Sequence, residues 1–145
     1  MKLSVAIDGP AGAGKSTIAK LLAHRFNLMY INTGAMYRAV TLEAITRDIP
    51  PQDVDNICKI IDMLEMHFEA DDLFVNGKNV SNEISMPLIS NNVSNYAAIS
   101  KVREKLVKLQ KSMSDRFGVV MDGRDIGTVV LKDAPFKFYL TASAD

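Results

Sequence analysis

The 145-residue sequence has a single cysteine, Cys58, which excludes an internal disulfide and suits a reducing compartment. Its 17 basic and 17 acidic side chains cancel, so net charge predicts no nonspecific attachment to nucleic acid or to an anionic membrane. No apolar run reaches transmembrane length, and the first one, Leu3–Ile7, is too short for a signal peptide. We therefore expect a cytoplasmic protein with neither a nucleic-acid nor a membrane partner.

Short apolar segments alternate with amphipathic segments along the chain, and this alternation indicates an α/β fold with a parallel sheet flanked by helices. The expected strands are 3–7, 29–31, 119–121 and 136–140. The expected helices are those between Gly14 and Asn27 and over 35–47, 54–64 and 101–116. Asn27 is expected to stop the first of these helices, and Gly118 the last.

The middle of the chain departs from this alternation. Segments 66–69, 73–75 and 78–80 have the residue types of short strands, and Asn76-Gly77 supplies the two positive-φ residues of a tight hairpin turn. We expect a small antiparallel patch of three strands, inserted between helices. The polar stretch 87–100, rich in Asn and Ser, is expected to be a broken helix.

The segment after the first expected strand fits the pattern G-x-x-x-x-G-K-[ST] of a phosphate-binding loop in full. Its glycines let backbone N–H groups approach phosphate oxygens, and the following helix presents its positive N-terminus. We expect Lys15 to reach the β- and γ-phosphates of a nucleoside triphosphate, and Ser16 to bind the accompanying Mg²⁺. The alternative, a Gly-rich turn that binds nothing, is disfavoured by the strand before the loop and the helix after it. The expected triphosphate-binding residues are Gly9, Pro10, Ala11, Gly12, Ala13, Gly14, Lys15, Ser16 and Thr17.

Three further clusters of charged residues accompany the loop. Arg38 lies about one turn into an expected helix, Arg103 is near the start of the long helix, and the segment Asp122–Thr128 follows an apolar strand. Singly, the arginines can be solvated helix charges and the last segment a polar turn. Together they place several guanidinium groups beside a triphosphate site, and arginine is suited to bidentate phosphate binding and to neutralising charge in phosphoryl transfer.

In order and spacing, these motifs resemble the bacterial cytidylate kinases, a family of nucleoside-monophosphate kinases. The resemblance covers residues 3–143 and rests on Ile7-Asp8-Gly9-Pro10, Thr33-Gly34-Ala35-Met36-Tyr37-Arg38, Lys101-Val102-Arg103-Glu104 and Asp122–Thr128. It implies a single P-loop kinase core over 1–145 with a monophosphate-binding region at 32–100. The antiparallel patch near 66–80 looks like the enlarged part of that region.

The resemblance implies that the protein transfers the γ-phosphoryl group of ATP to CMP or dCMP, with Mg²⁺, giving ADP and CDP or dCDP. The residues implied to be catalytic are Lys15, Arg38 and Arg124. Those implied to hold the acceptor are Thr33, Arg38 and Arg124 at its phosphate, and Ser94, Arg103 and Asp125 at the cytosine edge. Cytosine presents an amino donor beside two acceptors, which suits a carboxylate and an arginine, whereas uracil would set its O4 against the carboxylate.

Asp122 is a candidate to support Mg²⁺ through water, because it ends a strand that we expect beside the first. Two departures from the family pattern stand out. Asn32 occupies a position where we expect an aspartate, and the chain stops at Asp145, before the arginine-rich lid of the family. We therefore expect little or no transferase activity from the 145-residue form, and exposed apolar surface that favours self-association.

Two other functions stay open on the sequence. One is another small-substrate P-loop kinase, and the other is a non-catalytic nucleotide-binding fragment. A GTPase is disfavoured because no Asn-Lys-x-Asp motif occurs in the sequence. The sequence implies no obligate protein partner.

Overall fold

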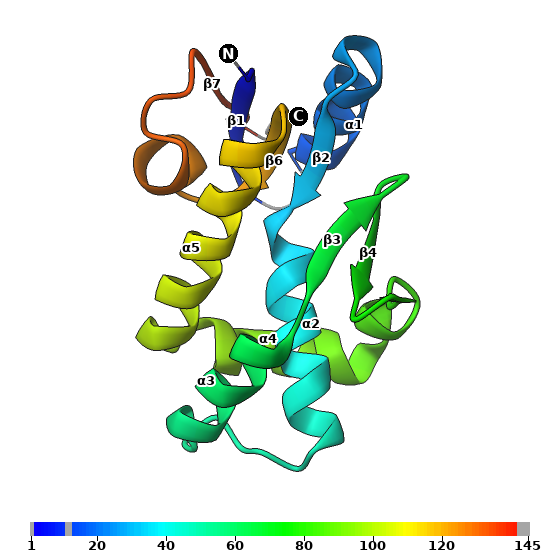
Figure 1. Ribbon diagram of the computed structural model, residues 1–145, viewed down its shortest axis with the longest axis vertical. Coiled ribbons are helices and arrows are strands. Elements are labelled where there is room, and N and C mark those ends of the chain that lie inside the picture. Colours follow the sequence, from blue (N-terminus) through cyan, green and yellow to red (C-terminus); the bar gives the residue numbers. More distant parts are fainter. Residues whose placement is uncertain (1, 11–12, 142–145) are drawn as a thin grey trace. The chain divides into compact units, whose positions relative to one another are not determined.

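The computed structural model describes residues 2–10 and 13–141. Ala11 and Gly12 of the predicted phosphate loop therefore lie outside the described residues. The chain divides into two compact units, and Figure 1 labels most of their helices and strands. Unit 1 comprises Met1–Thr33 and Leu109–Asp145, and unit 2 comprises Gly34–Lys108.

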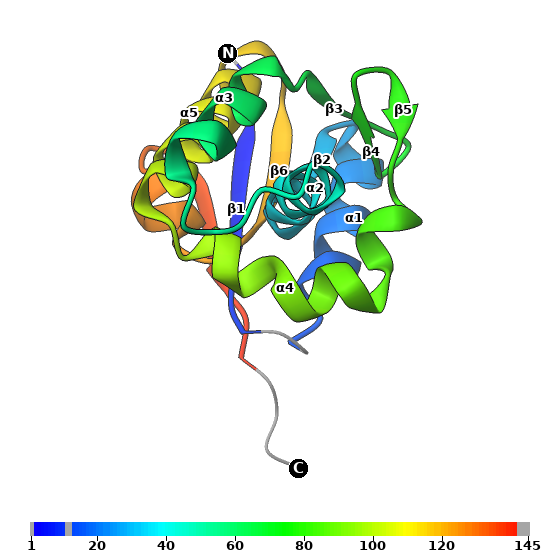
Figure 2. The ribbon, with the colours of Figure 1, turned by 90° about the horizontal axis from the view of Figure 1, so that it is seen from below.

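Unit 1 is built on a four-stranded parallel sheet with the order β2-β6-β1-β7. Its strands are β1 (Ser4–Asp8), β2 (Met29–Asn32), β6 (Val119–Gly123) and β7 (Phe136–Tyr139). Figure 2 shows β1 and β6 side by side. Asp8 pairs with Gly123, and Asn32 pairs with Asp122, so the carboxyl ends of β1, β2 and β6 meet at one edge of the sheet. The predicted parallel sheet and the α/β class are confirmed.

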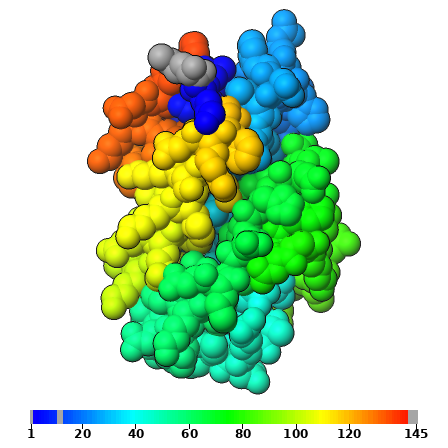
Figure 3. Space-filling model, viewed as in Figure 1, coloured from blue at the N-terminus to red at the C-terminus, as the bar shows by residue number. Residues whose placement is uncertain are grey.

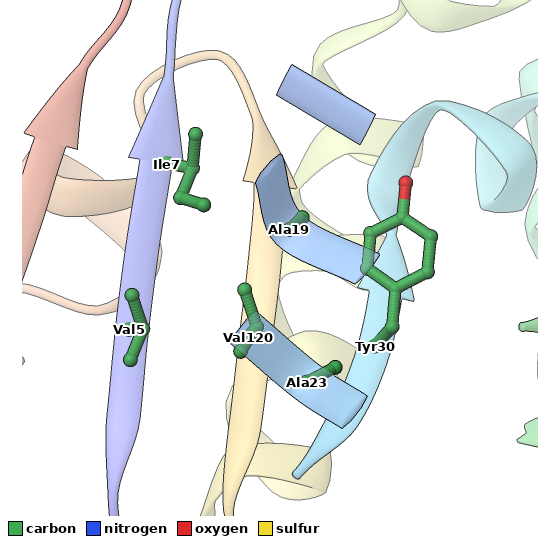
Figure 4. Packing of buried hydrophobic residues seen from close by; sticks show 6 residues of the cluster. All are labelled: Val5, Ile7, Ala19, Ala23, Tyr30 and Val120. Carbon is green, nitrogen blue, oxygen red and sulfur yellow. The ribbon is translucent and has the colours of Figure 1, made fainter. Parts of the chain in front are cut away.

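Helix α1 (Lys15–Phe26) packs against this sheet through two alanines. Ala19 and Ala23 are buried, and their small side chains let the helix backbone approach the strands closely. Asn27 ends the helix as predicted, with φ of 54° and its N–H donating to the carbonyl of Ala23. The buried cluster between helix and sheet consists of Val5, Ile7, Ala19, Ala23, Tyr30 and Val120 (Figure 4).

The last turns of helix α5 (Ser100–Arg116) return the chain to unit 1. The helix ends at Arg116, as predicted, but Gly118, which we expected to close it, does not have positive φ. A Cβ on Gly118 would stand 2.8 Å from Cδ2 of Leu28. This close neighbour is the flexible tip of the Leu28 side chain, and the Leu3 backbone is at ordinary contact distance, so neither left-handed backbone nor a rigid neighbour requires glycine here.

Unit 2 contains α2 (Thr33–Thr46), whose first residue belongs to unit 1, and α3 (Val54–Met63). The predicted antiparallel patch is confirmed as β3 (Met66–Glu69), β4 (Asp72–Val75) and β5 (Lys78–Asn79), in that order. Asn76 and Gly77, with φ of 50° and 83°, make the predicted turn between β4 and β5. Ala70 and Asp71 also have positive φ, and they connect β3 to β4.

The prediction of a broken helix over 87–100 is wrong. After the short 3₁₀ turn η1 (Glu83–Ser85), Pro87–Ala97 forms one uninterrupted helix, α4. Pro87 stands at its start, where a missing N–H costs nothing. Ile89 and Tyr96 are buried, and the Tyr96 hydroxyl donates to the carbonyl of Ile49 at 2.7 Å. Tertiary contacts therefore outweigh the low helix propensity of the Asn- and Ser-rich segment.

Candidate active site

The loop between β1 and α1 in unit 1 has the features of an anion-binding site. Gly14 caps α1 with φ of 84°, without a side-chain cap, and the first helical turn has no acidic residue. The first amides of α1 are therefore left to an anion. Lys15 donates from Nζ to the carbonyl of Gly9 at 2.5 Å, which draws its ammonium group over the loop. Ser16 and Thr17 are exposed beside it.

Gly9 is buried in this loop with φ of 149°. A Cβ at Gly9 would overlap the carbonyl oxygen of Leu140, which follows β7. Leu140 also donates its N–H to the carbonyl of Asp8 at 2.8 Å. The loop therefore needs glycine here because two segments of backbone pass within contact distance of each other.

Asp122, at the end of β6, is a buried acid that is 4% exposed. Tyr30 on β2 donates from its hydroxyl to Oδ2 of Asp122 at 2.6 Å. Burial raises the pKa of the Asp122 carboxyl, while the Tyr30 hydrogen bond and the charges of Lys15 and Lys20 lower it. Asp122 is in register with Ile7 on β1, two residues before the phosphate loop begins at Gly9.

The oxygen atoms of two predicted magnesium-binding residues suit a hard cation. The carboxylate of Asp122 and the hydroxyl of Ser16 are oxygen ligands, the kind that Mg²⁺ prefers. Across residues 2–10 and 13–141, no three His, Cys, Asp or Glu side chains gather in a metal-binding group. A cation held mainly by phosphate oxygens and water fits this donor set, whereas one that needs an all-protein cage does not.

Thr33, the first residue of α2, contacts the end of β6. It is 5% exposed, and its hydroxyl donates to the carbonyl of Asp122 at 2.9 Å. A Cβ on Gly123 would overlap Oγ1 of Thr33. The hydroxyl of Thr33 is therefore already bonded to the protein, and the backbone of residues 122–123 is held tightly against it.

Arg124 and Asp125 follow β6 and are both exposed. Asp125 has φ of 58° and precedes a short π-helical segment, η2 (Ile126–Val130), which lies in orange in the space-filling view (Figure 3). The carboxylate of Asp8 accepts hydrogen bonds from the backbone N–H groups of Ile126 and Gly127, at 2.7 and 2.9 Å. Sequence reasoning assigned no role to Asp8, although an acid at the end of an apolar strand, directly before the phosphate loop, was a usable signal.

Two arginines that are predicted to bind the acceptor lie in unit 2, and neighbouring groups form hydrogen bonds with both. Arg38 on α2 donates from Nη1 to the carbonyl of Ile84 at 3.1 Å and to Oγ of Ser90 on α4 at 2.8 Å. Arg103 on α5 forms a hydrogen bond with Tyr37. Burial raises the pKa of the Tyr37 phenol, and the charge and hydrogen bond of Arg103 lower it. Sequence reasoning assigned no role to Ser90 or Tyr37. Tyr37 lies in the motif at residues 33–38, which was a usable signal, whereas nothing local marks Ser90.

The predicted site residues divide between the two units. Unit 1 brings its predicted residues to the edge where β1, β2 and β6 end, and unit 2 carries the others on helices, where Ser94 on α4 and Arg103 on α5 are exposed. The described residues of unit 1 in this set are Gly9, Pro10, Ala13, Gly14, Lys15, Ser16, Thr17, Thr33, Asp122, Arg124 and Asp125. Those of unit 2 are Arg38, Ser94 and Arg103.

Comparison with known proteins gives consistent matches. A family model described as cytidylate kinase matches residues 5–145. A protein named cytidylate kinase from Clostridium acetobutylicum is 66% identical over 145 residues, which are all of this chain and 67% of the relative. Another from Clostridium perfringens strain SM101 is 61% identical over 143 residues, which are 99% of this chain and 66% of the relative. A third, from Clostridium botulinum strain Loch Maree, is 56% identical over 145 residues.

The chain thus spans about two thirds of the length of the curated relatives that it matches. Within the part that the structure describes, no helix is both long and apolar enough to cross a membrane.

Proposed function

Because this chain belongs to the cytidylate kinase family, we propose that the protein binds ATP and transfers the γ-phosphoryl group to CMP or dCMP, giving ADP and CDP or dCDP. The expectation of little or no transfer by the 145-residue form stays a prediction. The family and its kinase class, both predicted from the sequence motifs, are confirmed. Since the chain spans about two thirds of its relatives, the activity of the whole protein is part of the proposal. The predicted cytoplasmic location, and the expected absence of nucleic-acid, membrane and obligate protein partners, stay predictions.

One observation carries the proposal most directly. In unit 1, the carboxyl ends of three parallel strands bring the phosphate loop, the buried acid Asp122 and the segment Arg124–Asp125 to a common edge. Ligands of open α/β sheets bind outside this edge. A phosphate-binding loop and an exposed arginine at the same edge suit a reaction between two phosphorylated substrates.

The donor half of the proposal uses residues of the β1–α1 segment. The free amides at the start of α1 and the ammonium group of Lys15 would bind the β- and γ-phosphates. Ser16 and Asp122 would hold Mg²⁺, Asp122 through water, and the ion would neutralise charge on the phosphates. The protein then contributes alignment and fixed positive charge, with no covalent intermediate.

The acceptor half uses the residues that are predicted to bind CMP. Arg38 and Arg124 would bind the phosphate of CMP, with Thr33 beside it. Ser94, Arg103 and Asp125 would recognise the cytosine edge. Support comes from the contacts that hold Arg38 and Arg103 in place, since an arginine fixed before binding loses less conformational entropy when it binds an anion.

The test measures nucleotide binding by calorimetry together with ADP release, using CMP, dCMP, UMP and AMP as acceptors. We expect the cytidine nucleotides to bind at least about tenfold more tightly than UMP, because uracil sets its O4 against the carboxylate of Asp125. Equal affinities for CMP and UMP would contradict the assignment of Asp125 and Arg103 to the base.

Replacement of one arginine separates the acceptor from the donor. Arg124→Ala should weaken CMP binding by about a hundredfold, while a non-hydrolysable ATP analogue binds within about twofold of the wild type. Arg25→Ala is the matched control, because Arg25 is exposed in the last turn of α1, away from the phosphate loop. Loss of ATP binding in Arg124→Ala would refute its role at the acceptor.

A further inference from the structure

We propose that Asp8 is a positioning residue for the acceptor nucleotide: its carboxylate holds the backbone amides of Ile126 and Gly127 and thereby fixes the segment that presents Arg124 and Asp125. The inference rests on the proposed function, in which Arg124 and Asp125 bind CMP. It gives Asp8 a role that differs from that of the adjacent phosphate loop.

The backbone of Asp8 is held in the sheet by strands on both sides. Asp8 is the last residue of β1, which lies between β6 and β7 in the sheet. Its backbone is in register with Gly123 on one side and Tyr139 on the other, and its carbonyl accepts the N–H of Leu140 at 2.8 Å. Because strands on both sides hold residue 8, its carboxylate is a fixed point at the edge where the site lies.

The first N–H groups of the segment that Asp8 contacts need hydrogen-bond acceptors from outside that segment. Ile126 and Gly127 begin η2, so their N–H groups have no helical partner of their own. Each is bonded to a different oxygen of the carboxylate, Ile126 to Oδ1 at 2.7 Å and Gly127 to Oδ2 at 2.9 Å. Bonds of this kind to an ionised acceptor are stronger than neutral ones.

Two backbone features show how closely this segment is constrained. Asp125 has φ of 58°, in the left-handed region that is uncommon for non-glycine residues and that aspartate and asparagine tolerate better than most. A Cβ on Gly127 would stand 3.3 Å from Oδ2 of Asp8 and 3.3 Å from the side chain of Lys137. The carboxylate therefore sits directly against the turn, and its loss would release the residues next to Arg124 and Asp125.

The competing explanation is that Asp8 only stabilises the turn. A purely structural role would lower the stability of the protein without changing its preference for one acceptor base. A positioning role instead predicts a selective loss of CMP affinity, together with a smaller preference for CMP over UMP, because Asp125 is proposed to read the cytosine amino group.

The experiment compares Asp8→Asn with the wild type. Asparagine keeps the size of the side chain but lacks the charge and one of the two accepting oxygens. Amide exchange at Ile126 and Gly127, measured by NMR, should become at least about tenfold faster. In calorimetry, CMP should bind about tenfold more weakly, the CMP/UMP preference should fall several-fold, and a non-hydrolysable ATP analogue should bind within about threefold of the wild type.

Asp133→Asn is the matched control, because Asp133 is exposed in unit 1 and the same chemical change there should alter none of these values. If Asp8→Asn does not fold, Gly127→Ala adds a methyl group against the same carboxylate, and it should weaken CMP binding several-fold in the same selective way.

The outcomes separate the two proposals. A wild-type chain that binds ATP but not CMP would refute the proposed function, and the role of Asp8 at the acceptor with it. If the wild type binds CMP and Asp8→Asn binds it equally well with faster exchange at Ile126 and Gly127, Asp8 only stabilises the turn and the inference is overturned. Unchanged exchange in the variant overturns it as well.

Discussion

Arg38 is held by two acceptors of very different kinds, a backbone carbonyl and a hydroxyl group. The carbonyl of Ile84 cannot be removed by substitution, but the hydroxyl of Ser90 can. A guanidinium group that keeps only one partner samples more orientations before it binds a phosphate. Ser90 is therefore the point at which the preorganisation of Arg38 is open to experiment.

Ser90→Ala should weaken CMP binding about three- to tenfold and leave ATP binding unchanged, because a hydrogen bond to a charged group is lost on the acceptor side only. Calorimetry with each nucleotide measures both values. Ser114→Ala serves as the control, since the hydroxyl of Ser114 bonds only within α5, to the carbonyl of Lys111. Equal CMP affinity in Ser90→Ala and the wild type would show that Ile84 alone holds Arg38.

Asp122 makes the free energy of unfolding depend on pH, in a direction that is unusual for an aspartate. Burial raises its pKa, although the hydrogen bond from Tyr30 and the charge of Lys15 oppose this shift. The folded protein therefore holds the proton of Asp122 more tightly than the unfolded chain does. Its contribution to the free energy of unfolding is greatest at low pH, and it falls as pH rises from the unfolded pKa, about 4, through the higher pKa of the folded state.

Asp122→Asn removes this titration, since an amide carries no ionisable proton. The free energy of unfolding of the variant minus that of the wild type should increase as pH rises from about 4, and then become constant. Urea unfolding at a series of pH values measures the difference. Asp133→Asn, which changes an exposed acid, should show no comparable trend. A difference that falls with pH would mean that the pKa of Asp122 is lowered by folding.

At the scale of elements, the end of β6 packs against the first residue of α2 only because residue 123 is a glycine. Gly123 ends β6 directly against Thr33, the first residue of α2, and no Cβ fits between them. The hydroxyl of Thr33 donates to the carbonyl of Asp122 at 2.9 Å and closes the junction. The same glycine precedes Arg124, so packing at the junction also determines where the acceptor segment begins.

Gly123→Ala should lower the free energy of unfolding by at least ~2 kcal/mol, because the added methyl group overlaps Oγ1 of Thr33. Gly77→Ala is the control: φ there is 83°, but nothing lies within 4 Å of an added Cβ, so only the backbone cost of about 1 kcal/mol applies. The double variant Gly123→Ala/Thr33→Ala should recover part of the loss. Equal losses at Gly123 and Gly77 in urea unfolding would contradict this account.

At the scale of the whole molecule, the exposed strand β7 and the zero net charge of the chain both favour self-association. Within the part of the chain that the structure describes, β7 is an outer strand of the sheet, and Phe136, Phe138 and Tyr139 on it are 51%, 47% and 70% exposed. An apolar edge strand offers unpaired backbone groups to another chain, and a formal net charge of zero provides little repulsion. We therefore expect a second copy of the chain to associate along this edge.

Tyr139→Lys should shift the chain toward monomer at a concentration where the wild type associates, as measured by sedimentation velocity, because an edge lysine disfavours strand pairing. Leu21→Lys is the matched control, since Leu21 on α1 is exposed to a similar extent, 64%, but does not lie on a strand edge. If both substitutions reduce association equally, general apolar exposure is responsible and the edge is not.

Local patterns were enough to predict much of the fold and the kind of site. The apolar strand, the glycine-rich loop and the helix with its stop at Asn27 depend on residues close together in the chain, as does the Asn76-Gly77 turn. The order of motifs around Arg38, Arg103 and Asp122–Thr128 likewise indicated the family, because that information lies in residue identity and spacing. The spacing of apolar residues in a helix or strand reflects backbone geometry, so a short segment is enough to show it.

Contacts between distant segments were decided by the tertiary structure alone. α4 is continuous because Ile89 and Tyr96 are buried, which outweighs the turn-forming tendency of its Asn and Ser residues. Asp8 meets Gly127 across 119 positions of the chain, a pairing that no local pattern encodes. The chain's own sequence therefore determined which chemical groups the site contains, and only the packing of the sheet and helices determined which neighbours hold them.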